Sequence, residues 1–246
     1  MAGRGDKSVT RWRSERMDRD VTLVRWGSFG RPVLIFPTAG GDAEEIERNH
    51  LVDACAGLLE AGRVKIYSCD SVAGRALATF SGSPEYRMWL LNQFHQAVRH
   101  AVVSAIHADL GGSSQRIVTA GASIGAFNAV ALLCRFPDTF EAAIGMSGTY
   151  RIRRFLEDRW SEDLFFASPL DFLPGLDGDD LQLLQQRRVI LASGEGAHED
   201  IGESWALADV LGSKGVPNRV DSWGPETIHD WPTWWRMLPQ YLEELC

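Results

Sequence analysis

One stretch of the sequence decides the fold: Arg116-Ile-Val-Thr-Ala-Gly-Ala-Ser-Ile-Gly-Ala-Phe-Asn-Ala-Val-Ala-Leu-Leu133. A short apolar run leads into Gly121-Ala-Ser-Ile-Gly125, and an apolar run that can form a helix follows. A serine at such a junction is typical of a sharp turn that raises its hydroxyl above a sheet edge. Glycines two residues away on either side let the strand and the helix approach closely. The stretch therefore predicts a buried strand, a turn that exposes Ser123, and a helix.

Similar apolar runs occur elsewhere and suit strands that are buried on both faces of a parallel sheet; they are 33–36, 64–67, 142–146, 189–192 and 218–223. Helical patterns lie between them, at 42–59, 83–110, 127–136, 204–212 and 231–245, the last with a bend at Pro239. Alternating strands and helices predict an α/β fold with a doubly wound, mostly parallel sheet and helices on both faces. The segments Val9–Ser14 and Val21–Trp26 alternate in polarity and predict an antiparallel pair at the sheet edge.

The segment 151–188 is the least regular part of the chain. It carries bulky aromatic residues among many acids, which suits an inserted, lid-like element better than a second domain. We therefore expect a single domain over residues 1–246 with this insertion. Individual aromatic residues are expected to pack in the core or the insertion, so no pocket residues are assigned.

Composition excludes several classes of protein. The 246 residues carry 25 basic and 33 acidic side chains, a net charge of −8, which argues against a general nucleic-acid or anionic-membrane binder. No apolar run approaches the roughly 20 residues that span a bilayer, and the N-terminus lacks the apolar core of a secretory signal. The four cysteines match no zinc or redox motif and are expected as free thiols, so a cytoplasmic location is expected.

Ser123 needs a base to become a nucleophile, because a free hydroxyl is too weakly acidic. In this type of fold the chain order is serine, acid, histidine. His229 follows the last predicted strand and precedes a helix that Asp230 can cap, so it is the expected base. The remaining histidines are assigned no role: His50 precedes the serine, His198 lies among acids, and three are expected on the solvated face of the long helix (His95, His100 and His107).

The acid is expected in the loop that follows the run 189–192. A carboxylate there would accept the second ring N–H of the histidine and stabilise the imidazolium. Glu195, Glu199 and Asp200 compete for this role. We prefer Asp200 and keep Glu199 as the alternative, because the loop must extend over the sheet edge before it turns back.

The oxyanion of the reaction needs backbone N–H donors. Ile124, the residue after the nucleophile, is expected to supply one. The loop after the run 33–36 should supply the other, and Pro37 has no N–H to give. Ala39 is preferred there, with Thr38 and Gly40 as alternatives.

The chain resembles the α/β-hydrolase superfamily, and within it the esterase family that includes esterase D (S-formylglutathione hydrolase), feruloyl esterases, enterochelin esterases and the antigen 85 mycolyltransferases. The resemblance rests on Gly121–Gly125, Phe136-Pro-Asp138, Met146-Ser-Gly148 and Ile228-His-Asp-Trp-Pro-Thr-Trp234. It implies Ser123 as the nucleophile and His229 as the base.

The expected function is hydrolysis of carboxylic esters or thioesters through an acyl-enzyme on Ser123. The chemistry needs no cofactor and no metal, and its partner is a small acyl ester or thioester; a homo-oligomer stays open. Two alternatives are kept. An acyltransferase would use the same residues, and a non-catalytic binding protein is suggested by Pro37-Thr38, where many family members have His-Gly or Asp-Gly.

Overall fold

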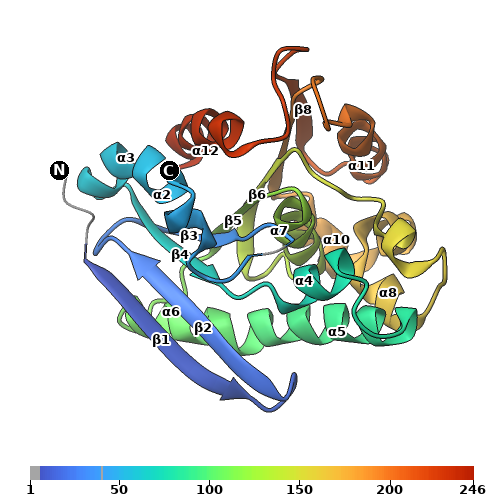
Figure 1. The fold of residues 1–246 in the computed structure, drawn as a ribbon, viewed down its shortest axis with the longest axis horizontal. Coiled ribbons are helices and arrows are strands. Elements are labelled where there is room, and N and C mark those ends of the chain that lie inside the picture. Colours follow the sequence, from blue (N-terminus) through green and yellow to red (C-terminus); the bar gives the residue numbers. More distant parts are fainter. Residues whose placement is uncertain (1–5, 40) are drawn as a thin grey trace.

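A computed structural model describes residues 6–39 and 41–246. Eight strands form one sheet in the order β1-β2-β4-β3-β5-β6-β7-β8 (Figure 1). The strands are β1 (Lys7–Ser14), β2 (Arg19–Trp26), β3 (Arg31–Phe36), β4 (Val64–Cys69), β5 (Ile117–Ala122), β6 (Phe140–Met146), β7 (Arg188–Ser193) and β8 (Asn218–Ser222). The mostly parallel, doubly wound sheet that the sequence predicts is confirmed.

The N-terminal strands form the expected antiparallel edge. β1 pairs antiparallel with β2, and β2 pairs antiparallel with β4. The other neighbouring strands pair parallel, and every residue of β4 and β5 is buried. Phe36 at the end of β3 pairs with Gly121 of β5, so the loops after these two strands leave the same sheet edge side by side.

Helices cover both faces of the sheet (Figure 1). The α-helices are α1 (Glu45–Arg48), α2 (Leu51–Ala54), α3 (Ala56–Glu60), α4 (Val72–Ala78), α5 (Pro84–Ala97), α6 (Val103–Asp109), α7 (Ile124–Arg135), α8 (Glu162–Ala167), α9 (Pro169–Phe172), α10 (Gly178–Leu184), α11 (Ile201–Ser213) and α12 (Trp231–Leu245). A π-helical segment, η1 (Val98–Val102), joins α5 to α6, and short 3-10 turns form η2 (Ile152–Leu156) and η3 (Leu173–Gly175). One buried cluster packs α1–α3 and α12 on one face; the other packs α5–α7, α11 and the segment 151–188 on the opposite face.

Two helical predictions need correction. The single helix expected over 42–59 is broken into α1, α2 and α3. His50, with a left-handed φ of 60°, separates α1 from α2, and Cys55, with φ −95° and ψ 7°, separates α2 from α3. The helix α4 was not predicted; its first turn contains a glycine, which weakens a helical pattern.

The segment 151–188 packs onto the core through fully buried leucines: Leu156, Leu164, Leu173 and Leu184. It contacts α5 and α7, and these leucines belong to the same cluster as those helices. The segment therefore completes one face of the sheet, and its role as a lid stays a prediction.

His95 corrects the expectation of solvated helix histidines. It is fully buried between α5 and α7, where Nε2 lies 3.1 Å from Oδ1 of Asn128 and the ring stacks on Phe127. Burial, helped by the nearby Arg135 charge, lowers the pKa of His95 to about 3. The helical spacing with Leu91 and Val98 already places position 95 on the apolar face.

Candidate active site

Ser123 lies on a sharp turn between β5 and α7. Its backbone has φ 57° and ψ −122°, a conformation that costs a non-glycine residue about 1–3 kcal/mol. Two of its backbone hydrogen bonds tie it to β6 and the following loop: Ser123 N–H donates to Met146 O (2.9 Å), and Thr149 N–H donates to Ser123 O (3.3 Å). The strained residue is thus held by the end of β6 and the loop that follows it.

The two flanking glycines are required by close backbone contacts. A Cβ on Gly121 would lie 2.3 Å from the carbonyl carbon and oxygen of Gly125. A Cβ on Gly125 would lie 2.4 Å from the carbonyl oxygen of Phe36, the last residue of β3. Both contacts are with backbone, which cannot move aside as a flexible side chain can. The motif Gly121–Gly125 therefore packs α7 against β5 and β3 at the closest distance the backbone allows.

Glu199 is the acid that meets His229. Its carboxylate is buried, with 1% of the side chain exposed, and Oε2 lies 3.7 Å from Nδ1 of His229. Ser147 Oγ donates to Oε1 at 2.6 Å, and Ser193 Oγ lies 3.1 Å from Oε2. The His229–Glu199 separation is longer than a hydrogen bond, and such contacts often tighten only when substrate binds.

The pKa of Glu199 reflects these contacts. Burial by itself would raise it, but the His229 ring and the Ser147 and Ser193 hydroxyls outweigh burial and hold the pKa below its ordinary value. Glu199 is therefore a carboxylate near neutral pH, as a partner for an imidazolium must be.

The other two acids of the loop are engaged elsewhere. Asp200 caps α11: its Oδ1 accepts a hydrogen bond of 3.0 Å from Gly202 N–H, and the residue is exposed. Glu195 accepts from the hydroxyl of Ser222. The geometry thus favours Glu199 as the acid over Asp200, which we prefer from the sequence alone. Adjacent residues of an extended loop point to different sides, so only one of the two can meet His229.

Trp234 supports the acid from the last helix. Its Nε1–H donates to Ser147 Oγ at 2.9 Å, and Ser147 in turn donates to Glu199. The Trp234 ring also meets the His229 ring edge-on, with centroids 5.2 Å apart. Sequence reasoning assigned no role to Ser147 or Ser193, although both stand at strand ends on the same sheet edge as Ser123.

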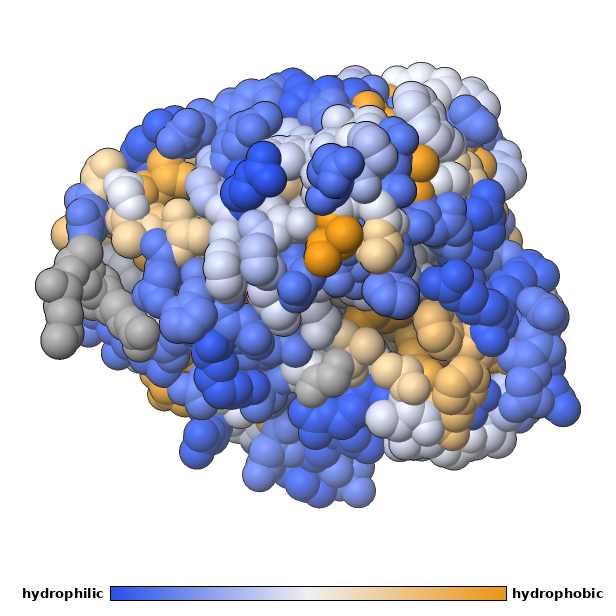
Figure 2. All heavy atoms as spheres, turned by 45° about the horizontal axis from the view of Figure 1, so that its top comes forward, coloured by the Kyte–Doolittle hydropathy of each residue, from blue (hydrophilic) through white to orange (hydrophobic). Residues whose placement is uncertain are grey.

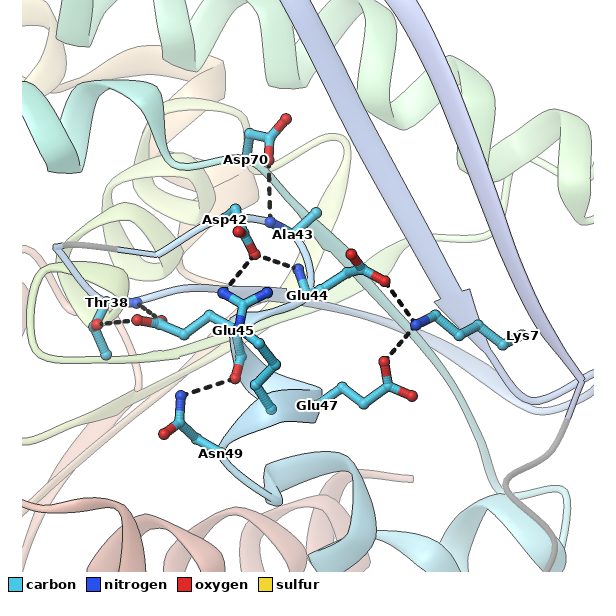
Figure 3. Close-up of polar contacts among 10 residues, drawn as sticks. Lys7, Thr38, Asp42, Ala43, Glu44, Glu45, Glu47, Asn49 and Asp70 are labelled. Atoms are coloured by element: carbon cyan, nitrogen blue, oxygen red, sulfur yellow. Dashed lines mark hydrogen bonds and ion pairs between the residues drawn. The ribbon is translucent and has the colours of Figure 1, made fainter.

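The loop after β3 is held by a polar network (Figure 3). The carboxylate of Glu45 accepts from both the N–H (2.7 Å) and the hydroxyl (2.8 Å) of Thr38, and Asp70 accepts from Ala43 N–H (3.1 Å). The Thr38 amide is therefore engaged. Ala39 is half-buried beside this network, and the Gly40 alternative lies outside the described residues.

The described residues contain no group of three or more His, Cys, Asp or Glu side chains that could hold a metal ion. Within residues 6–39 and 41–246, no helix combines the length and apolar character needed to cross a membrane. All four cysteines are free thiols, three of them buried.

Comparisons with known proteins give structural matches only, since no family model and no curated protein sequence matches the chain. A ferulic acid esterase superposes with a TM-score of 0.72 at 15% identity, covering 99% of this chain and 98% of its own. MPT51 of Mycobacterium tuberculosis gives 0.72 at 15% identity, covering 98% of both chains, and an S-formylglutathione hydrolase from Staphylococcus aureus gives 0.63 at 14%, covering 100% and 99%. The chain therefore has the α/β-hydrolase fold, in the form found in these structures.

Proposed function

We propose that the protein is a serine esterase that hydrolyses carboxylic esters or thioesters through an acyl-enzyme on Ser123. One observation carries the proposal: a buried carboxylate, Glu199, contacts His229 at the same sheet edge where the strained turn exposes Ser123. Nucleophile, base and acid follow in the chain order typical of this fold. The esterases of similar fold support the same reaction class.

In the proposed reaction, His229 takes the proton of the Ser123 hydroxyl as Oγ attacks the acyl carbon. The C–O or C–S bond then breaks, and His229 returns the proton to the leaving alcohol or thiol. Water attacks the acyl-enzyme by the same route and releases the acid. Glu199 stabilises the imidazolium in both halves, and the N–H groups of Ile124 and Ala39 bind the oxyanion.

Neither a metal nor an organic cofactor is needed for these steps. The proposed partner is a small acyl ester or thioester. The free thiols favour a reducing compartment, so the proposal includes the cytoplasm as the place of action.

A fluorophosphonate probe tests the proposal directly. The wild-type protein should gain one label by intact mass, and Ser123→Ala and His229→Ala should gain none. The same two variants should lose hydrolysis of p-nitrophenyl butyrate by about 10³-fold or more. Their circular dichroism and thermal unfolding serve as the control for folding. Labelling that persists in folded Ser123→Ala would refute the nucleophile, and no labelling of folded wild-type protein would favour a non-catalytic binding protein.

A further inference from the structure

A cavity of about 700 Å³ opens at the start of the segment 151–188. Its lining begins at Tyr150, one residue after the Thr149 whose N–H bonds to Ser123 O, and it includes Asp200, the neighbour of Glu199. The cavity therefore adjoins the loop whose backbone hydrogen-bonds to Ser123.

Three arginines line this cavity, and they are not equally engaged. Arg153 pairs with Asp171 through two guanidinium nitrogens. Arg151 and Arg154 each approach Oε1 of Glu203, at 3.7 and 3.6 Å, distances too long for hydrogen bonds. Both of these guanidinium-bearing side chains are about half exposed, at 52%.

Glu203 is committed to the backbone and shares one negative charge between the two guanidinium groups. It is buried, and its Oε2 accepts 2.7 Å hydrogen bonds from the N–H groups of Tyr150 and Arg151. Arg151, Arg154 and Glu203 together therefore carry one excess positive charge, in a protein whose net charge is −8.

The remaining acids around the cavity do not cancel this charge by contact. Asp171 is paired with Arg153, and Asp200 caps α11. Asp158 also lines the cavity but, in the part of the chain that the structure describes, makes no ion pair with Arg151 or Arg154. Two guanidinium groups with unfilled donors are thus left facing a shared cavity.

Arg154 lies between Thr149, which hydrogen-bonds to Ser123, and the aromatic ring of Phe155. Its Nη2 lies 3.4 Å from Thr149 Oγ1, and its guanidinium lies 5.1 Å from the centre of the Phe155 ring. Phe155 in turn packs against Phe80, with centroids 6.3 Å apart, and Phe80 is 54% exposed. Figure 2 shows an apolar hollow bordered by hydrophilic residues on the face that it presents.

We infer that Arg151 and Arg154 form a subsite for a carboxylate on the substrate, so that the preferred ester carries an anionic group at the far end of an apolar chain. The guanidinium fork matches a carboxylate with two parallel hydrogen bonds. Phe80 and Phe155 contact the apolar chain. The inference rests on the proposed esterase function and names a substrate class for it.

Matched substrates separate the subsite from the catalytic chemistry. The p-nitrophenyl monoester of glutaric acid carries a free carboxylate, and its methyl-capped diester is neutral with the same reacting bond. Wild-type protein should turn over the anionic ester with a kcat/KM about tenfold or more above that of the neutral ester, and added salt should reduce this ratio.

Arg154→Met should bring the ratio of kcat/KM for the anionic ester to that for the neutral ester down to about one. Turnover of the neutral ester should stay within about twofold of wild type. Arg159→Met is the matched control, because Arg159 pairs with Glu85 and does not line the cavity, and it should keep the ratio. Equal turnover of both esters by wild type, or a ratio that survives in Arg154→Met and Arg151→Met, would overturn the subsite. Loss of turnover of both esters and of fluorophosphonate labelling in wild type would instead refute the esterase itself.

Discussion

Two loops leave the same edge of the sheet, and the residues proposed for catalysis are held differently in each. The turn between β5 and α7 is held by backbone contacts. Neighbouring carbonyl groups lie so close to Gly121 and Gly125 that no side chain fits at either position. In the loop between β7 and α11 the backbone also lies close to its neighbours at Gly194 and Gly196, but the carboxylate of Glu199 is held by side chains. Ser147 and Ser193 contact that carboxylate, and Trp234 donates to Ser147.

This contrast indicates which parts of the site tolerate substitution. A steric turn either forms or fails, so substitutions there should act on folding. A hydrogen-bonded loop can lose one donor and keep its path, so substitutions there should act on rate and pH dependence. Four measurements test this contrast.

The largest effect is expected for Gly125→Ala. The new Cβ would meet the Phe36 carbonyl at 2.4 Å, and separating α7 from β3 should cost about 3–5 kcal/mol of unfolding free energy. Urea denaturation followed by circular dichroism measures it. Gly57→Ala is the control: its Cβ would meet no atom within 4 Å in α3, so it should be neutral or stabilise by up to about 1 kcal/mol. Equal stability of the two variants would remove the steric account.

Glu199→Gln should leave the fold intact and lower kcat by about 10²–10⁴-fold, because the imidazolium loses its counter-charge. Asp200→Asn is the matched neighbour: asparagine caps a helix as well as aspartate does, so kcat should stay within about twofold. Steady-state kinetics on one neutral ester decides between them. If Asp200→Asn fell as far as Glu199→Gln, the assignment of the acid would be wrong.

The two loops should also differ in their response to pH. His95 of α5 contacts Asn128 of α7, and its pKa of about 3 lies below the ordinary 6.5. Its stabilisation is therefore present above pH 6.5 and is lost as pH falls toward 3, with a slope of about 1.4 kcal/mol per pH unit. Glu199 has a lowered pKa, so its contribution is present above 4.5 and is lost only below that value.

The free energy of unfolding, measured with urea, should thus fall between pH 7 and pH 5 in wild type. In His95→Gln this fall should be smaller. In the same range Ser147→Ala should run parallel to wild type, because Glu199 stays charged there. A parallel slope in His95→Gln would contradict the buried, neutral histidine.

The smallest effect is expected for Trp234→Phe. It removes the donor to Ser147 Oγ but keeps the aromatic contact with His229, so one indirect hydrogen bond of about 1 kcal/mol is lost. We expect kcat to fall about fivefold with KM unchanged. Trp235→Phe removes an equivalent donor to Asn49 O, remote from Glu199, and should leave kcat unchanged. Equal effects of the two would show that Trp234 acts through packing alone.

The sequence pattern predicted the elements that depend on residues close together in the chain. The strands and the turn at Ser123 follow from apolar runs and small residues that are adjacent in the sequence. The break at His50 and the burial of His95 depend on packing against other elements. The choice between Asp200 and Glu199 depends on donors 52 and 6 residues away from Glu199, which no spacing rule in the loop itself reveals.

The antiparallel edge of the sheet has a consequence for solubility. β1 is the outermost strand and carries Lys7, Arg11 and Arg13, of which Lys7 and Arg13 are paired with acids and Arg11 is exposed. A second copy that added its own β1 there would bring like charges together, and pairing of this kind is what leads sheet proteins to aggregate. Charged side chains along the outermost strand thus oppose edge-to-edge pairing of two sheets.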